Sequence, residues 1–220
     1  MFSARTRRLL AAVAAAGIAI LLAVLAGAAR SAVAPNLLQN GGAELGPGVT
    51  DPSGVATTIP GWVRTGNFTV VKYGVSGGFP DTTIPTAFHG GKNFFAGGPS
   101  NPNSGASQTA SVATRAAAID AGKVAATLSG YLGGYSTQSD SLTVTASFLD
   151  ASGQKLGTIK IGPVTPAQRK SETTLVAKSV TAKAPPKTRS ILVALHAVRT
   201  DGSYNDGYAD NLQLTLAASR

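Results

Sequence analysis

The sequence contains no cysteine among its 220 residues. Disulfide bonds are therefore excluded, so an exported domain with this sequence must be stabilised by its hydrophobic core or by a bound ion. Long apolar runs are also missing after residue 34. Any membrane contact is consequently confined to the N-terminal segment, and the rest of the chain is long enough to bury one core.

Charged residues make up only 13% of the chain, and basic residues exceed acidic ones. Four of the 19 lysines and arginines lie within residues 1–34, which leaves 15 basic and 10 acidic residues, a net charge of +5, in the remainder. These bases are scattered, and no basic run is interleaved with aromatic residues. The sequence therefore predicts no nucleic-acid partner, although a mildly cationic surface could favour anionic cell-wall polymers.

The first 34 residues have the layout of a secretory signal peptide. Three arginines precede an uncharged apolar run over 9–29, and small-x-small sites follow at 26–28 and 32–34. This order predicts cleavage close to residue 34 and a secreted, extracellular protein. Because the run is close to the ~20 residues that span a bilayer, an uncleaved membrane anchor is the alternative.

Short alternating runs bounded by turn residues dominate the rest of the chain, and only 113–122 has a helical pattern. The alternation predicts strands at 37–40, 68–73, 93–96, 107–112, 124–132, 141–149, 155–161, 173–181, 191–198 and 211–216. About ten strands with almost no helix are typical of an all-β fold. We therefore predict one domain over 35–220, an antiparallel β-sandwich or jelly roll.

An acidic residue stands on the apolar face of the last predicted strand. Strict alternation places Tyr208, Asp210 and Leu212 on one face. A buried carboxylate costs several kcal/mol unless it is paired, hydrogen-bonded or bound to a metal. Glu44 follows the first predicted strand, and a Ca²⁺ between Glu44 and Asp210 would remove the repulsion between them, with backbone carbonyls as further ligands. The alternative is that Asp210 caps a turn or pairs with a lysine.

One motif for nucleophilic catalysis is present in part. The stretch GVSGG, residues 74–78, matches the pattern G-x-S-x-G around Ser76 and follows a predicted strand. A nucleophile elbow also needs a helix directly after it, and the following FPDTTIP cannot start one. The acidic residues are isolated and provide no catalytic carboxylate pair. The sequence therefore predicts a protein that is not an enzyme.

Aromatic residues make up 6% of the chain, and some of them could contact sugar rings. Trp62 lies in IPGW, while Tyr204, Asn205 and Tyr208 lie in a predicted loop rich in glycine, asparagine and aspartate. Aromatic faces stack on sugars and the polar neighbours supply hydrogen bonds, so these four residues are the candidate ligand-binding residues. The alternative for Trp62 is an ordinary place in the core.

Four stretches resemble a known fold family. The segments NLLQNGGAE, IPGW, HGGKNFF and YADNLQL look like the galactose-binding-like jelly roll of many carbohydrate-binding modules, and the chain also resembles a group of exported bacterial proteins of uncharacterised function. The resemblance implies a structural calcium held by Glu44 and Asp210, with backbone oxygens from the HGGKN loop. Ala43 departs from the family, which usually has an aromatic residue before the first acid.

Taken together, these features predict a secreted, non-catalytic β-sandwich protein with a structural Ca²⁺. Its expected partner is an extracellular glycan or a cell-wall polymer, and its only expected membrane contact is through an uncleaved N-terminal segment. Two alternatives stay open. The first is a structural or adhesive envelope protein without sugar specificity, and the second is a small extracellular hydrolase that uses Ser76.

Overall fold

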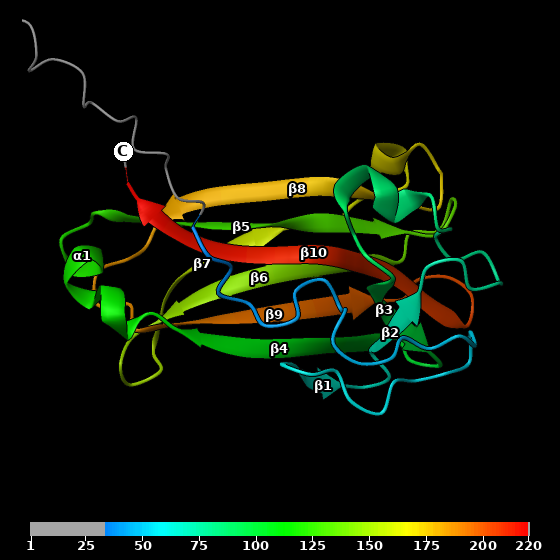
Figure 1. The fold of residues 1–220 in the computed structure, drawn as a ribbon, viewed down its shortest axis with the longest axis horizontal. Coiled ribbons are helices and arrows are strands. Elements are labelled where there is room, and N and C mark those ends of the chain that lie inside the picture. Colours follow the sequence, from blue (N-terminus) through cyan, green and yellow to red (C-terminus); the bar gives the residue numbers. More distant parts are fainter. Residues whose placement is uncertain (1–33, 220) are drawn as a thin grey trace, which may run out of the picture. The chain divides into compact units, whose positions relative to one another are not determined.

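The computed structural model describes residues 34–219, so the predicted signal peptide or anchor lies outside the described residues except for Ala34. The described chain forms two five-stranded antiparallel sheets (Figure 1). Sheet A has the order β2 (Thr69–Lys72), β3 (Asn93–Pro99), β10 (Tyr204–Ala218), β5 (Val124–Gly134) and β8 (Thr174–Lys183). Sheet B has the order β1 (Val63–Thr65), β4 (Asn103–Ser111), β9 (Ser190–Val198), β6 (Ser141–Leu149) and β7 (Lys155–Ile161). The predicted all-β sandwich is confirmed.

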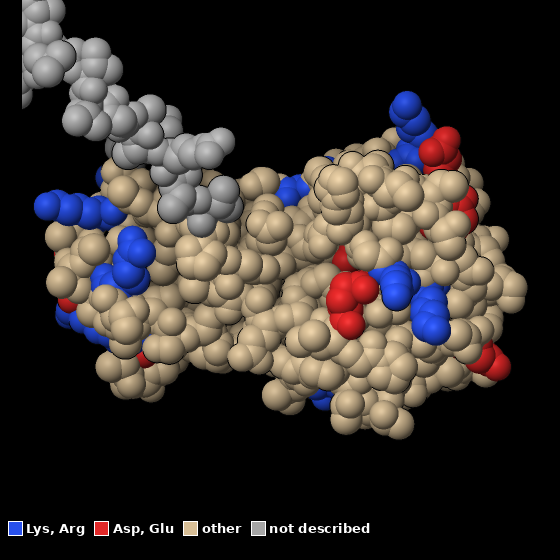
Figure 2. Space-filling model, viewed as in Figure 1, with Lys and Arg blue, Asp and Glu red and all other residues tan. Residues whose placement is uncertain are grey.

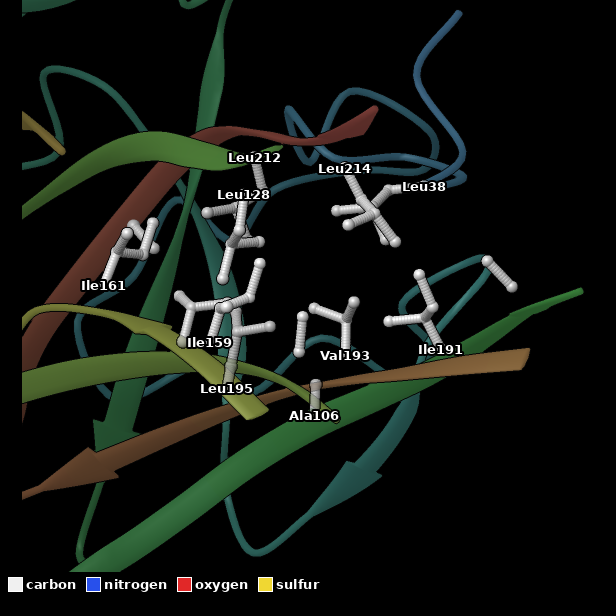
Figure 3. Close-up of a cluster of buried hydrophobic side chains, with 14 of the residues drawn as sticks. Leu38, Ala106, Leu128, Ile159, Ile161, Ile191, Val193, Leu195, Leu212 and Leu214 are labelled. Carbon is white, nitrogen blue, oxygen red and sulfur yellow. The ribbon is translucent and has the colours of Figure 1, made fainter. Parts of the chain in front are cut away.

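The central core lies between the two sheets, where alternate residues of each strand point inward. In β6, Leu142, Val144, Ala146 and Phe148 are buried, while the residues between them are only half-buried. Figure 3 shows leucine, isoleucine and valine side chains from both sheets converging in this layer. Each fully buried side chain of this size contributes about 1.5–3 kcal/mol through removal of its apolar surface from water. This cluster provides the stabilisation that disulfides cannot supply.

The segment predicted as the first strand, 37–40, is not a strand. It runs beside β10, but the Asn36 side chain replaces part of the ladder: its Nδ2 donates to the carbonyl of Leu212 at 3.0 Å and its Oδ1 accepts from the N–H of Leu214 at 2.9 Å. Two backbone bonds flank this contact: the Leu37 N–H donates to the Leu214 carbonyl at 2.8 Å, and the Leu212 N–H donates to the Gly41 carbonyl at 2.9 Å. A side-chain amide therefore does the pairing that alternation alone had assigned to a backbone strand.

β10 contains a bulge at the acidic residue, which corrects the predicted alternation of this strand. Asp210 pairs with Tyr131 and Gln213 pairs with Ser129. Between these two pairs the chain advances three residues in β10 but two in β5. Asn211 has the left-handed φ of 47°. The extra residue reverses the faces. Leu212 consequently points into the central core, whereas Tyr208 points to the opposite side of sheet A.

A second hydrophobic cluster covers part of the outer side of sheet A. Its buried members include Tyr73, Phe79, Phe94 and Tyr208, which pack edge-on or tilted against one another. The loop after β2, including the 3₁₀ helix η1 (Ile84–Phe88), folds over this cluster. The predicted strand face bearing Tyr208 and Asp210 is therefore buried under a loop rather than between the sheets.

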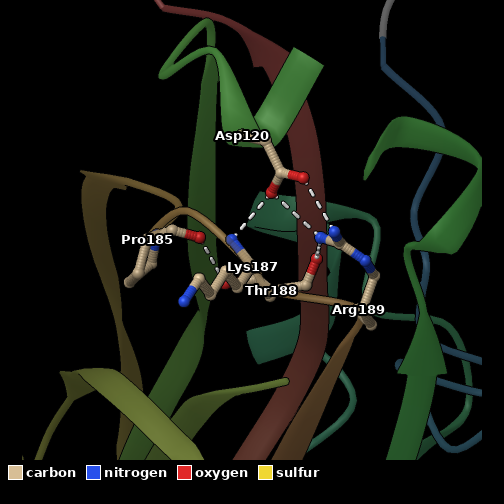
Figure 4. A network of polar contacts seen from close by, with 5 residues as sticks. All are labelled: Asp120, Pro185, Lys187, Thr188 and Arg189. Carbon is tan, nitrogen blue, oxygen red and sulfur yellow. Dashed lines mark hydrogen bonds and ion pairs between the residues drawn. The ribbon is translucent and has the colours of Figure 1, made fainter. Parts of the chain in front are cut away.

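The single predicted helical stretch is confirmed as a 3₁₀ turn, η2 (Ala113–Arg115), followed by α1 (Ala116–Asp120). Asp120 at its end binds the turn that precedes β9 (Figure 4). Its Oδ1 accepts from the Lys187 N–H at 2.7 Å, and its Oδ2 pairs with Arg189 Nη2 at 2.7 Å. The remaining short helix is η3 (Ala167–Arg169). Within the part of the chain that the structure describes, no helix is long and apolar enough to cross a membrane.

Candidate functional site

The two acids predicted to meet, Glu44 and Asp210, do lie beside each other. The loop after η1 touches both of them. The backbone N–H groups of Lys92 and Asn93 donate to Glu44 Oε1 at 2.9 and 2.8 Å. A Cβ added to Gly91 would lie 2.5 Å from Glu44 Cδ, and one added to Gly90 would lie 2.6 Å from Asp210 Oδ2. Two adjacent glycines therefore let one loop press against both carboxylates.

Asp210 is fully buried, and two groups donate hydrogen bonds to it. The Tyr73 hydroxyl donates to Oδ2 at 2.8 Å, and the N–H of Asn211 donates to Oδ1 at 2.6 Å. Burial raises the pKa of Asp210 to about 8, with repulsion from Glu44 adding to the rise and the two hydrogen bonds opposing it. The pKa of Tyr73 is also raised, chiefly by burial and then by the charge of Asp210.

Among the described residues, no cationic side chain forms a salt bridge with either carboxylate. Within residues 34–219 the one salt bridge joins Arg189 and Asp120, and no group of three or more His, Cys, Asp or Glu residues is arranged to hold a metal. Asn93 Oδ1, at the start of β3, faces Gly48 and is buried without a hydrogen-bond partner in the described chain. The two carboxylates are oxygen donors of the kind that Ca²⁺ prefers. The residues present therefore fit a calcium ion.

A separate groove lies at the edge of sheet B, beyond the first residue of β1, where β4 is paired only with β9. It has a volume of about 590 Å³ and is bounded by the segment 37–39, the start of β1 and the last residues of β4. Its lining combines two amides, three hydroxyls and apolar side chains without any charged residue: Leu37, Gln39, Gly61, Trp62, Val63, Ser107, Gln108, Thr109, Ala110 and Ser111. The face of the molecule in Figure 2 has a mostly uncharged middle, with an acidic patch beside two basic ones to the right of it.

Two glutamines fix the walls of this groove. Gln108 Oε1 accepts from the Gln39 N–H at 2.9 Å, and Gln108 Nε2 donates to the Gln39 carbonyl at 3.0 Å. The Gln108 amide thus pairs with the backbone of Gln39 in the way that a neighbouring strand would. The contact could not be predicted from the sequence, because the two residues are 69 positions apart and no local pattern connects them.

Trp62 lines the groove but belongs mainly to the core. Its side chain is 8% exposed, packs edge-to-face on Phe95 with ring centroids 5.5 Å apart, and donates from Nε1 to the carbonyl of Asn40 at 3.2 Å. Neighbouring Val63 is 71% exposed. A ligand in the groove would therefore meet the edge of the indole ring, whereas broad apolar contact would come from Val63.

The other three candidate ligand-binding residues lie in β10, not in a loop as predicted. Asn205 and Tyr208 are completely buried, and Tyr204 is half-buried against Phe79 with centroids 5.0 Å apart. The Tyr208 hydroxyl donates to Asp206, while the Tyr204 hydroxyl and Asn205 Nδ2 are buried without a partner in the described chain. In this structure these residues have no broad exposed face for a sugar ring, and their role in binding stays a prediction.

A buried arginine, which no sequence pattern predicted, lies near Asp206 at the end of the sandwich where β10 begins. Arg169 is 2% exposed and donates to the backbone carbonyls of Ser136, Glu172, Tyr135 and Gln138. Burial lowers the pKa of Arg169, although the nearby acids oppose this effect. These contacts hold the loop after β5 against the loop between β7 and β8, so the arginine organises the end of the fold.

The structure places Ser76 in an exposed turn, with no helix directly after it. His89 and His196 are exposed, and His196 lies on the outer face of sheet B. No hydrogen bond joins Ser76 to either histidine in the described residues. The arrangement lacks the strand-to-helix geometry of a nucleophile elbow.

No protein-family model matches the chain. A search of curated proteins likewise finds no match. Among solved structures, a family 16 carbohydrate-binding module is 19% identical with a TM-score of 0.50, over 82% of this chain and 99% of that one.

TmCBM61 in complex with β-1,4-galactotriose is 14% identical with a TM-score of 0.47, over 84% and 99% of the two chains. The active domain of bacteriophage CBA120 tailspike protein 4 is 16% identical with a TM-score of 0.47, over 83% of this chain, which spans only 21% of that one. The two-sheet β-sandwich of this chain is therefore a fold that it shares with the family 16 carbohydrate-binding module.

Proposed function

We propose that this protein is a secreted, non-catalytic carbohydrate-binding protein that takes a neutral glycan in the groove beside Trp62. The observation that carries the proposal is the lining of the groove. Amides and hydroxyls supply hydrogen bonds to sugar hydroxyls, and Val63 with the edge of Trp62 supplies apolar contact. Since no lining residue is charged, a neutral ligand leaves no buried charge unpaired. The kinship of the fold to carbohydrate-binding modules is in accord with this ligand class.

We place a structural Ca²⁺ between Glu44 and Asp210 in the same proposal. The ion would neutralise two carboxylates that form no salt bridge within the described residues. It would also fix the segment 36–45. Gln39 in that segment forms one wall of the groove, so the ion would act on ligand binding by positioning this wall. It would take no part in chemistry.

The test is binding of a small panel of neutral glycans: β-1,4-galactan and xylan as polymers, and the corresponding trisaccharides, measured by retention and by calorimetry with Ca²⁺ present. Val63→Lys places a charged chain in the groove, whereas Thr65→Lys, on the same face of β1 but outside the groove, is the matched control. Both residues are exposed, so neither substitution disturbs the core.

We expect Val63→Lys to weaken binding at least about tenfold, or ~1.4 kcal/mol, and Thr65→Lys to leave it unchanged. Retention of no glycan above an inert control by the unaltered protein would refute carbohydrate binding and favour the structural or adhesive alternative. Ester or glycoside hydrolysis that is lost in Ser76→Ala would refute the non-catalytic assignment.

A further inference from the structure

Part of the outer side of sheet A is not covered by the second cluster. On this bare part the outward residues of three strands stand in register. One row is Thr215, Thr127 and Thr181, and the next is Gln213, Ser129 and Ser179. All six are exposed or half-buried, and the hydroxyls of Thr127 and Thr181 lie 2.8 Å apart. The sheet therefore presents a regular array of five hydroxyls and one amide.

An aromatic pair closes one end of this array. Tyr131 is the next outward residue of β5 after Ser129, and Phe88 at the end of η1 stacks on it with ring centroids 3.9 Å apart and an interplanar angle of 16°. Both rings are half-buried. The Phe88 carbonyl accepts from Asn211 Nδ2 at 2.8 Å, which ties the aromatic residue to the bulge of β10. The pair forms a fixed apolar step at the edge of the polar face.

We infer that the Phe88–Tyr131 step and the adjoining hydroxyl face form a second contact surface for an extended neutral polysaccharide. Aromatic rings at a boundary, beside an array of hydroxyl donors and acceptors, match the alternating apolar faces and hydroxyls of a sugar chain. The outward positions carry no acid, and their one base is Lys183 at the far corner of β8. A neutral chain is therefore favoured over an acidic or a basic one.

The dimensions of the face suit a polymer better than a single sugar. From Tyr131 to Ala125 along β5 the strand rises about 20 Å, which is the length of several sugar rings. The face belongs to sheet A, whereas the groove beside Trp62 lies at the edge of sheet B. Two separate contact surfaces on one protein raise the avidity for a polymer that reaches both, without changing the affinity for a short oligosaccharide bound in the groove.

This inference rests on the proposed function, and its test uses the same panel of polymers and trisaccharides. Thr127→Lys places a charged chain in the middle of the face, and Phe88→Leu keeps the apolar volume but removes the aromatic ring. Thr145→Lys, at a half-buried outward position of β6 in sheet B, is the matched control for the lysine. Thermal melting of each variant verifies that it is folded.

We expect Thr127→Lys and Phe88→Leu each to reduce retention on the polymer about threefold or more, while the affinity for the trisaccharide and the behaviour of Thr145→Lys stay unchanged. Polymer retention that both variants leave intact would overturn the second surface alone, because the groove would still bind. Failure of the unaltered protein to bind any member of the panel would overturn both this inference and the proposed function.

Discussion

The Tyr73 hydroxyl donates a 2.8 Å hydrogen bond to Asp210 Oδ2 across 137 positions of sequence. The contact exists because the bulge in β10 turns the carboxylate toward the outer side of sheet A, where Tyr73 is buried in the second cluster. The carboxylate is thus enclosed by an aromatic ring, a loop and the neighbouring acid Glu44. Ionisation of Asp210 in that setting is unfavourable unless a cation binds beside it.

Calcium should stabilise the fold through Asp210. At a hundredfold excess over its Kd, an ion that binds only the folded state adds about 2.7 kcal/mol, which for a domain of this size raises Tm by about 5–10 °C. The measurement is thermal melting of the purified protein with Ca²⁺ and with a chelator. Asp210→Asn should abolish the difference, whereas Asp201→Asn, at an exposed acid, should retain it. Equal melting with Ca²⁺ and with chelator in the unaltered protein would contradict the assignment.

In chelator, stability should fall as pH rises. Burial raises the pKa of Asp210 to about 8 and that of Asp206 to about 6, so the folded state holds protons that the unfolded state releases near pH 4. The loss of stability therefore begins near pH 4, slows above pH 6 once Asp206 has ionised, and ends near pH 8. Repulsion from Glu44 adds to the rise in the pKa of Asp210, whereas the charge of Arg169 opposes the rise in the pKa of Asp206.

Denaturant unfolding at pH 5, 6, 7 and 8 measures this profile. Asp210→Asn should flatten the part between pH 6 and 8 because its side chain does not titrate. Calcium should stabilise the protein more at pH 8 than at pH 6, since the ion has fewer protons to displace. A profile that rises over this range in chelator would show that Asp210 stays ionised in the fold.

The regular strands could be predicted from the sequence because their alternation is local. Predicted strands at 141–149 and 155–161 coincide with β6 and β7. Two features broke the pattern. Asn36 pairs with β10 through its side chain where a strand was expected, and the bulge reverses the faces at Asp210. Asn211 is a weak sequence signal for the bulge, because asparagine tolerates a left-handed φ. Alternation alone cannot show whether the residue adopts that conformation.

Part of the candidate site could be predicted from the cost of a buried acid and from the resemblance to a known fold family. Glu44 and Asp210 were paired by that resemblance and by the cost of a buried acid, and the structure brings them together. The groove was not found, because it depends on Gln39 meeting Gln108 across two segments. Tyr204 and Tyr208 were assigned to a loop because glycine, asparagine and aspartate surround them, yet tertiary packing against Phe79 extends β10 through them.

Alanine at Gly91 should destabilise the protein more than alanine at Gly122. Both glycines have a left-handed φ, 77° and 67°, so each substitution carries the backbone strain of about 1–2 kcal/mol. A Cβ at Gly122 meets nothing within 4 Å, whereas one at Gly91 would lie 2.5 Å from Glu44 Cδ. The additional clash should cost about 1–3 kcal/mol and weaken the response to calcium. Equal unfolding free energies of the two variants, each measured in calcium, would argue against a tight contact at Glu44.

Arg169→Met should be among the most destabilising substitutions outside the hydrophobic core. Methionine fills a similar volume but leaves four backbone carbonyls without their donor, and it removes the one buried positive charge near Asp206 and Asp140 in the described chain. A buried polar group left without its hydrogen-bond partner costs about 1–3 kcal/mol. Lys170→Met, at the exposed neighbouring position, removes the same charge from the sequence and should change the free energy of unfolding by less than about 0.5 kcal/mol.

Because removal of Arg169 also raises the pKa of Asp206 further, the Met variant should lose additional stability between pH 6 and 7. Denaturant unfolding of both variants at these two pH values tests the magnitude and the pH dependence together, and a loss under 1 kcal/mol for Arg169→Met would mean that water satisfies these carbonyls.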